Sequence, residues 1–119
     1  MSSYSTKMIC TIKQMELSEI ISCLQEMNAE TVFVSIRQLG EYTSAAMLAM
    51  EKLYLRNKSY ASLAVMLTEQ DGIQRADIVG YGGGSGMLNI SLGANSEFGE
   101  KAAAILEECG FEEEEESWM

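Results

Sequence analysis

From Ser59 to Ala94 the chain alternates between two kinds of side chain with a period of two. In the first run, one face carries Ala61, Leu63, Val65 and Leu67, and the other carries Tyr60, Ser62, Ala64, Met66 and Thr68. A period of two is typical of a strand with one buried face. The pattern therefore predicts a strand that begins near Ser59.

Two further runs of this kind follow, each after a turn signal. The second comes after Asp71-Gly72 and places Ala76, Ile78 and Gly80 opposite Arg75, Asp77, Val79 and Tyr81. The third comes after a glycine run and places Leu88, Ile90 and Leu92 opposite Met87, Asn89 and Ser91. Strands joined by tight turns predict an antiparallel meander on which the rest of the chain packs.

The first forty residues change from one period to another and back. Alternation predicts a strand from about Thr6 to Gln14. The spacing of Leu17, Ile20, Ile21, Leu24 and Met27 is helical and predicts an amphipathic helix from Leu17 to Asn28. Alternation returns from Glu30 to Leu39, and Gly40 ends that strand.

The segment from Glu41 to Asn57 fits two structures. Its alanines, methionines and leucine have high helix propensity. A strand instead completes a hairpin with the run at Ser59, and both of its faces are then largely apolar, which implies a strand covered on both sides or an interface. The residue pattern alone leaves helix and strand open.

A second helix follows the meander. Asn95 or Ser96 is expected to cap it, its apolar stripe includes Phe98, Ala102, Ile105, Leu106 and Cys109, and Gly110 is expected to end it. Glu112 to Glu116 form a run of like charges that favours a disordered tail. We therefore expect one domain over residues 1–111 and an acidic tail over residues 112–119, in which Trp118 is a candidate docking residue.

Charge and composition exclude several classes of function. The formal net charge is −10, and an acidic chain is poorly suited to bind nucleic acid or an anionic membrane. No run of apolar residues is long enough for a membrane span or a signal peptide, so we expect a cytoplasmic protein. Cys10, Cys23 and Cys109 are widely separated and histidine is absent, so no metal site and no cofactor are expected. The three thiols are expected to be small buried side chains in a reducing compartment.

Four short segments resemble a known family. They are Glu51–Ser59, Ala61-Ser62-Leu63, the glycine run and Leu92-Gly93-Ala94. Together they are similar to a family of small uncharacterised bacterial proteins, over roughly residues 6 to 110. The resemblance implies that Glu41–Asn57 is a strand in a long hairpin. It implies no activity, because none is established for that family.

The glycine run is the most distinctive candidate site: Gly82, Gly83, Gly84, Ser85 and Gly86. No lysine follows it as in a phosphate-binding loop, a strand rather than a helix is expected after it, and Ser85 has no histidine base. A tight turn is favoured. The alternative is a pocket in which backbone amides of this turn, with Tyr54 and Arg56, bind a small anion or metabolite.

These patterns predict an α+β fold in the order β-α-β-β-β-β-β-α, with two amphipathic helices on one face of an antiparallel sheet. The other face is also expected to carry apolar side chains: Tyr60, Met66, Val79, Tyr81 and Met87. A monomer exposes them, so we expect a non-enzymatic module that self-associates, most simply as a two-fold homodimer, or that binds another protein. No catalytic residues are predicted. An anion-binding or metabolite-binding domain is the alternative.

Overall fold

The computed structural model describes residues 4–54, 59–81 and 92–115. The elements within these ranges are β1 (Tyr4–Cys10), α1 (Leu17–Gln25), β2 (Glu30–Gly40), β3 (Thr43–Tyr54), β4 (Ser59–Gln70), β5 (Ile73–Tyr81), α2 (Leu92–Glu108) and β6 (Glu112–Glu113). The ambiguous segment before residue 55 is therefore a strand, as the family resemblance implies.

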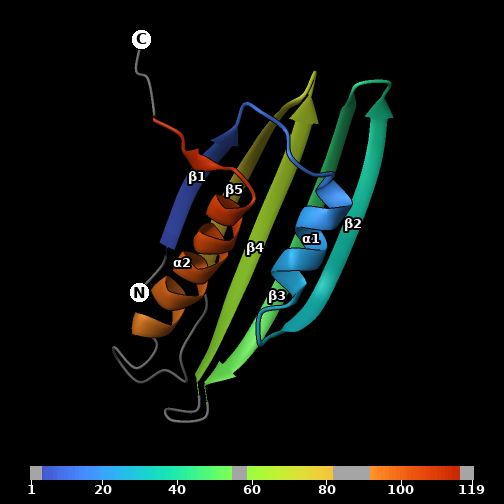
Figure 1. Cartoon of the computed structure of the whole chain (residues 1–119). Helices are drawn as coiled ribbons and strands as arrows, with labels where there is room; N and C mark the ends of the chain where they lie inside the picture. The colour runs from blue at the N-terminus through green and yellow to red at the C-terminus, as the bar shows by residue number, and fades with distance from the viewer. Residues whose placement is uncertain (1–3, 55–58, 82–91, 116–119) are drawn as a thin grey trace.

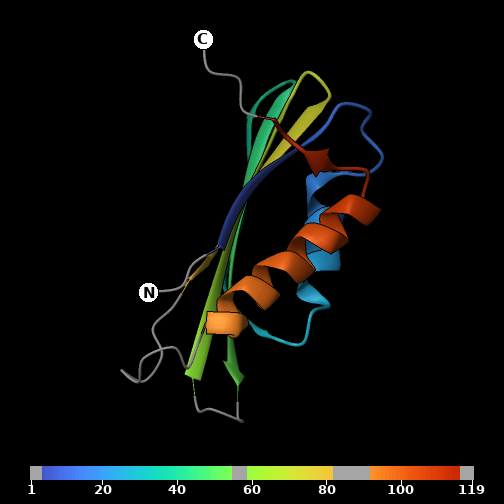
Figure 2. The same ribbon diagram turned by 90° about the vertical axis from the view of Figure 1, so that its left-hand side faces the viewer.

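The strands form one antiparallel sheet in the order β2-β3-β4-β5-β1-β6. Figure 1 shows both helices in front of this sheet, with α1 over β2, β3 and β4 and α2 over β4, β5 and β1. Figure 2, which views the sheet edge-on, shows both helices on the same side. The predicted α+β class, with two helices packed on one face of the sheet, is confirmed.

The core lies between the helices and the sheet, on what we call the covered face. The alternating residues Leu63, Val65, Leu67 and Ile78 point into it and are essentially inaccessible to solvent. From α1 the stripe of Leu17, Ile20, Ile21 and Leu24 packs onto them, and from α2 Phe98, Ala102 and Leu106 do the same. The period-two and helical patterns therefore point to one shared apolar layer.

Two sequence signals end elements as predicted. Asp71 and Gly72 both have positive φ, 53° and 84°, and connect β4 to β5 in a two-residue hairpin. At the end of α2, Gly110 has φ 101°, and the amide of Phe111 donates to the carbonyl of Leu106 at 3.0 Å. That bond, with Gly110 N to Glu107 O, forms a Schellman motif, and it turns Phe111 into the core.

The two elements at the start of the chain end earlier than predicted. β1 stops at Cys10 rather than Gln14, because its partner β5 begins at Ile73 and so offers only one strand residue beyond the last pair, Cys10 with Gln74. α1 stops at Gln25 rather than Asn28, and the amides after it bond three residues back, as in a tightened last turn.

The start of α2 and the segment that follows α2 differ from the prediction. Leu92, expected to end a strand, is the first residue of α2, and Asn95 and Ser96 lie inside the helix rather than at its cap. A cap preference of about 1 kcal/mol is too small to fix where a helix begins. After α2, Glu112 and Glu113 pair with Ile9 and Met8 as β6, so the acidic run begins within the sheet.

Candidate functional site

The face of the sheet opposite the helices, the open face, carries a cluster of large apolar side chains. Cross-strand partners point to the same side of a sheet, and the register places these side chains together on β2, β3, β4 and β5. Seven of them are exposed by 39% to 53% and form what we call the apolar patch: Phe33, Met47, Leu53, Tyr60, Met66, Val79 and Tyr81. No described element covers them (Figure 2).

Small side chains separate the large ones within the patch. One cross-strand row runs Phe33, Ala49, Ala64, Val79, and the next runs Ser35, Met47, Met66. Large residues on a background of alanine and serine make a surface of ridges and hollows. Such a surface can interdigitate with a second sheet, as the two inner faces of a β-sandwich do.

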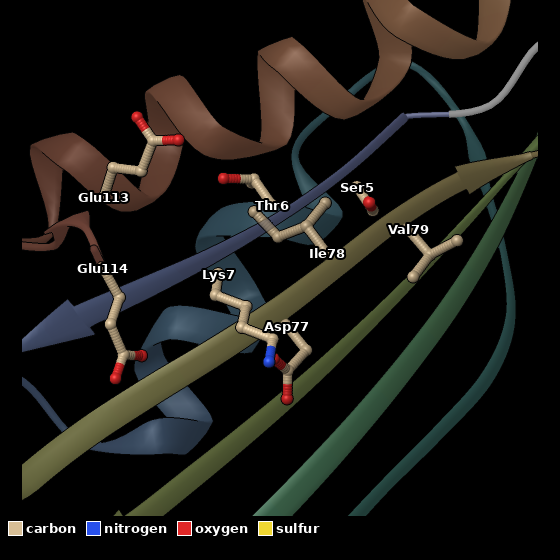
Figure 3. A pocket seen from close by; sticks show the side chains of 8 residues that line it. All are labelled: Ser5, Thr6, Lys7, Asp77, Ile78, Val79, Glu113 and Glu114. Atoms are coloured by element: carbon tan, nitrogen blue, oxygen red, sulfur yellow. The ribbon is translucent and has the colours of Figure 1, made fainter. Parts of the chain in front are cut away.

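The open face becomes charged toward β1 and β6. Lys7 pairs in register with Asp77, and Nε of Arg75 lies 3.5 Å from a carboxylate oxygen of Glu114. Figure 3 shows the Lys7 and Asp77 side chains lying side by side on β1 and β5. Both residues line a hollow of about 420 Å³, together with Glu113 and Glu114 of the acidic run. The apolar patch is therefore bordered by charge toward β1 and β6, and Glu51 on β3 and Arg37 on β2 add charged side chains to the same face.

The edge strand β2 is exposed on both of its faces. Val34 and Ile36 point to the covered face, since they pair with Leu48 and Ala46, but α1 leaves them 43% and 48% exposed. Val32 and Leu39, at the two irregularities of the strand, are more exposed still. Edge strands of soluble proteins are usually protected by charge or by bulges. Apart from its bulges, β2 has little protection, and it extends the apolar surface around the sheet edge.

One family model matches residues 1–110 of the chain. The chain belongs to DUF6054, a family of unknown function. No curated protein and no solved structure matches it. The DUF6054 description names no activity, so membership in the family assigns no function to this surface. None of the helices in the described ranges is both long and apolar enough to cross a membrane.

Most of the site residues predicted from the sequence of this DUF6054 member lie outside the described residues. These are Arg56, Gly82, Gly83, Gly84, Ser85 and Gly86, together with Met87 and Trp118. Tyr54 is the last residue of β3. The anion site that Tyr54, Arg56 and the glycine run are expected to form stays a prediction. The open-face residues Tyr60, Met66, Val79 and Tyr81 are where the alternation placed them.

Sequence reasoning did not single out Phe33 and Met47 as members of the patch. The available signal was the strand pattern itself, since both faces of β2 and β3 are apolar. A strand with two apolar faces is either buried on both sides or part of an interface. In this sheet β3 lies under the helices on one face only.

A polar cluster closes the covered face at one end. The buried Gln74 donates from Nε2 to the Met15 carbonyl and to Glu69, both at 2.9 Å, and Lys13 Nζ donates to Glu69 at 2.8 Å. Burial disfavours the Glu69 carboxylate, but the hydrogen bonds from Lys13 and Gln74 outweigh it and hold the pKa of Glu69 below its ordinary value. This cluster ties the β1–α1 connection to β4 and β5, which is a structural role.

Proposed function

We propose that this chain is a non-enzymatic module that self-associates as a two-fold homodimer through the apolar patch of its open face. The observation that carries the proposal is the gathering of seven large, half-exposed apolar side chains on one side of the sheet. Exposed apolar clusters of this kind mark interaction surfaces on soluble proteins. A second copy is proposed as the occupant because the area of the face and the distribution of its side chains support an isologous interface.

The area of the face matches that of a stable dimer. The sheet has five long strands. With strands about 4.8 Å apart, roughly 10 residues long and rising about 3.3 Å per residue, the face covers about 800 Å². A standard interface buries about 800 Å² per partner. The open face is therefore large enough to form a complete interface with its own copy.

The distribution of side chains suits a two-fold axis. The centre of the patch alternates large and small residues, so Met66 or Phe33 of one copy can fill the space over Ala49 or Ala64 of the other. The charged border holds both signs, with Lys7 and Arg75 beside Asp77 and Glu114. Because the border holds both signs, opposite charges of the two copies can meet across a two-fold axis.

Two finer parts of the proposal concern source and location. We propose that the protein is bacterial, from the family resemblance, and cytoplasmic. Cys10, Cys23 and Cys109 support the cytoplasmic location because they are free thiols, which persist in a reducing compartment.

Sedimentation velocity on three variants tests the dimer. Met66→Glu places a charge in the middle of the patch, and we expect its dimer dissociation constant to rise at least about tenfold, which corresponds to about 1.4 kcal/mol. The matched control is Ala104→Glu, which adds the same charge to an exposed position of α2 on the other side of the molecule, and it should dimerise like the unsubstituted chain.

The third variant separates the open face from the sheet edge. Ile36→Lys places a charge on the helix side of β2, away from the patch. If the two copies meet face to face, this variant stays dimeric. If Ile36→Lys dissociates the dimer and Met66→Glu does not, the copies are joined through β2 and the proposal for the open face is wrong.

A further inference from the structure

Two cysteines that are far apart in the sequence meet beside one solvent-open hollow. Cys23 lies on α1 and Cys109 directly follows α2, and the two helices pack against each other on the covered face. Both side chains line a hollow of about 350 Å³, together with Met15, Met27 and Ile105. Glu26 and Glu108 complete its lining.

The two thiols differ in their access to solvent. Cys23 is half-buried and open to reagents that enter the hollow, whereas Cys109 is only 4% exposed. Burial, with the Cys23 side chain beside it, raises the pKa of the Cys109 thiol to about 11. A small oxidant therefore meets Cys23 first, and Cys109 stands behind it as a protonated thiol.

The third cysteine is placed differently. Cys10 is 1% exposed, and its Sγ donates a hydrogen bond to the carbonyl of Ile12 at 3.2 Å. It does not line the hollow. Cys10 is thus an internal reference thiol in the same molecule.

We propose that Cys23 and Cys109 are a modification site, a thiol pair that a peroxide converts to a disulfide joining α1 to the end of α2. The Cys23 sulfur attacks one oxygen of hydrogen peroxide, the O–O bond breaks, and Cys23 becomes a sulfenic acid with release of one water. The Cys109 sulfur then attacks the Cys23 sulfur. The S–S bond forms, the S–O bond breaks, and the hydroxyl leaves as a second water with the Cys109 proton.

The same geometry makes the disulfide slow to reverse. A reducing thiolate reaches the Cys23 sulfur more easily than the buried Cys109 sulfur, and its attack expels Cys109. A thiol with a high pKa is a poor leaving group in this exchange. We therefore infer that the oxidised form persists after the oxidant is removed.

Peptide mapping of the full chain tests this directly and needs no variant. The protein is treated with hydrogen peroxide, the oxidant is removed, the chain is unfolded in guanidinium chloride so that its remaining thiols can all be alkylated with N-ethylmaleimide, and the peptides are identified by mass spectrometry. We expect a Cys23–Cys109 cross-link that is lighter than the two thiol peptides by two hydrogens, with Cys10 alkylated. Because the bond closes a long loop, the melting temperature should rise and should fall again after reduction.

Three results overturn the proposal. They are three alkylated cysteines after oxidation, a sulfinic acid at Cys23 without the cross-link, and a cross-link that involves Cys10 or joins two chains through Cys23. The variant Cys23→Ser serves as the control, because its substitution lies at a half-exposed position. It should leave Cys109 alkylated and its melting temperature unchanged by peroxide.

Discussion

The two faces of the sheet are built by the same strands and have different chemistry. On the covered face, the residues of β4 are Leu63, Val65 and Leu67, at most 1% exposed. On the open face, the alternate residues of the same strand are Ser62, Ala64 and Met66, of which Met66 is 45% exposed. The covered face is a core buried under the two helices. The open face also carries apolar side chains, but no described element covers them.

The difference teaches which face is needed for the single chain to fold. Burying a large aliphatic side chain contributes about 1.5–3 kcal/mol, and the covered face does this many times over. The open face keeps much of its apolar area in water, so its contribution comes when a second surface covers it. In the proposed dimer, folding of the chain depends on one side of the sheet and association depends on the other.

Truncating two neighbouring residues of β4, one on each face, tests most sharply whether the two faces differ in their contribution to stability. Leu67→Ala empties a fully buried position and should lower the free energy of unfolding by about 2–5 kcal/mol. Met66→Ala, one residue earlier and on the open face, should lower it by less than about 1 kcal/mol at concentrations where the chain is monomeric. Urea denaturation of dilute protein measures both. Equal losses would contradict the division of roles.

A smaller effect is expected where Gly99 of α2 packs against Tyr4 of β1. A Cβ added at Gly99 would lie 2.2 Å from the ring of Tyr4, so Gly99→Ala forces β1 and α2 apart. We expect a net loss of about 1–3 kcal/mol, even though alanine favours a helix. Gly40→Ala is the control, because its new Cβ meets only Thr43 at an ordinary 3.8 Å. If Gly99→Ala has the same melting temperature as the unsubstituted chain, the Tyr4 ring moves aside at no measurable cost and the expectation is wrong.

The smallest effect concerns the polar cluster at the rim of the covered face. The pKa of Glu69 is lower in the folded chain than its ordinary value of 4.5, so its contribution to stability is present above that pH and is lost as pH falls through the folded pKa. Glu69→Gln should lower the free energy of unfolding at pH 7 by about 1 kcal/mol.

The pH dependence of the Glu69→Gln variant tests whether the ionised carboxylate is the source of the stability difference. Relative to the unsubstituted chain, Glu69→Gln should be less sensitive to acid, so the two unfolding free energies converge below pH 4.5. Denaturant titrations at pH 7, 5 and 3 measure this. A difference that stays constant across the three pH values would exclude the carboxylate as its source.

The fold could be predicted because local patterns and tertiary packing agree in most elements. Alternation identified β4 and β5, the helical stripe identified α1, and Gly110 identified the end of α2. The segment of β3 was undecided because helix propensity conflicts with its strand pairing, and propensity is the weaker influence when both neighbours are strands.

The candidate surfaces could be predicted only in part. The alternation of β4 and β5 placed Tyr60, Met66 and Val79 on a shared face, but their alignment with Phe33 on β2 depends on the strand register. The meeting of Cys23 and Cys109 depends on how two helices pack on the sheet, which no local pattern encodes. The sixth strand is a pairing of two glutamates with β1 and has no sequence signal of its own.

Hydroxyl-radical footprinting, which labels both methionine and tyrosine side chains, tests the central claim most directly when it is run across protein concentrations, because Met47 and Met66 lie within the patch and are each 45% exposed in the single chain. The account predicts that both become protected as the concentration rises into the range where sedimentation shows twice the mass of one chain, while the exposed Tyr42 on the β2–β3 turn keeps its labelling rate. A chain that stays monomeric at high micromolar concentration, or that dimerises with Met47 and Met66 labelled at an unchanged rate, would contradict it.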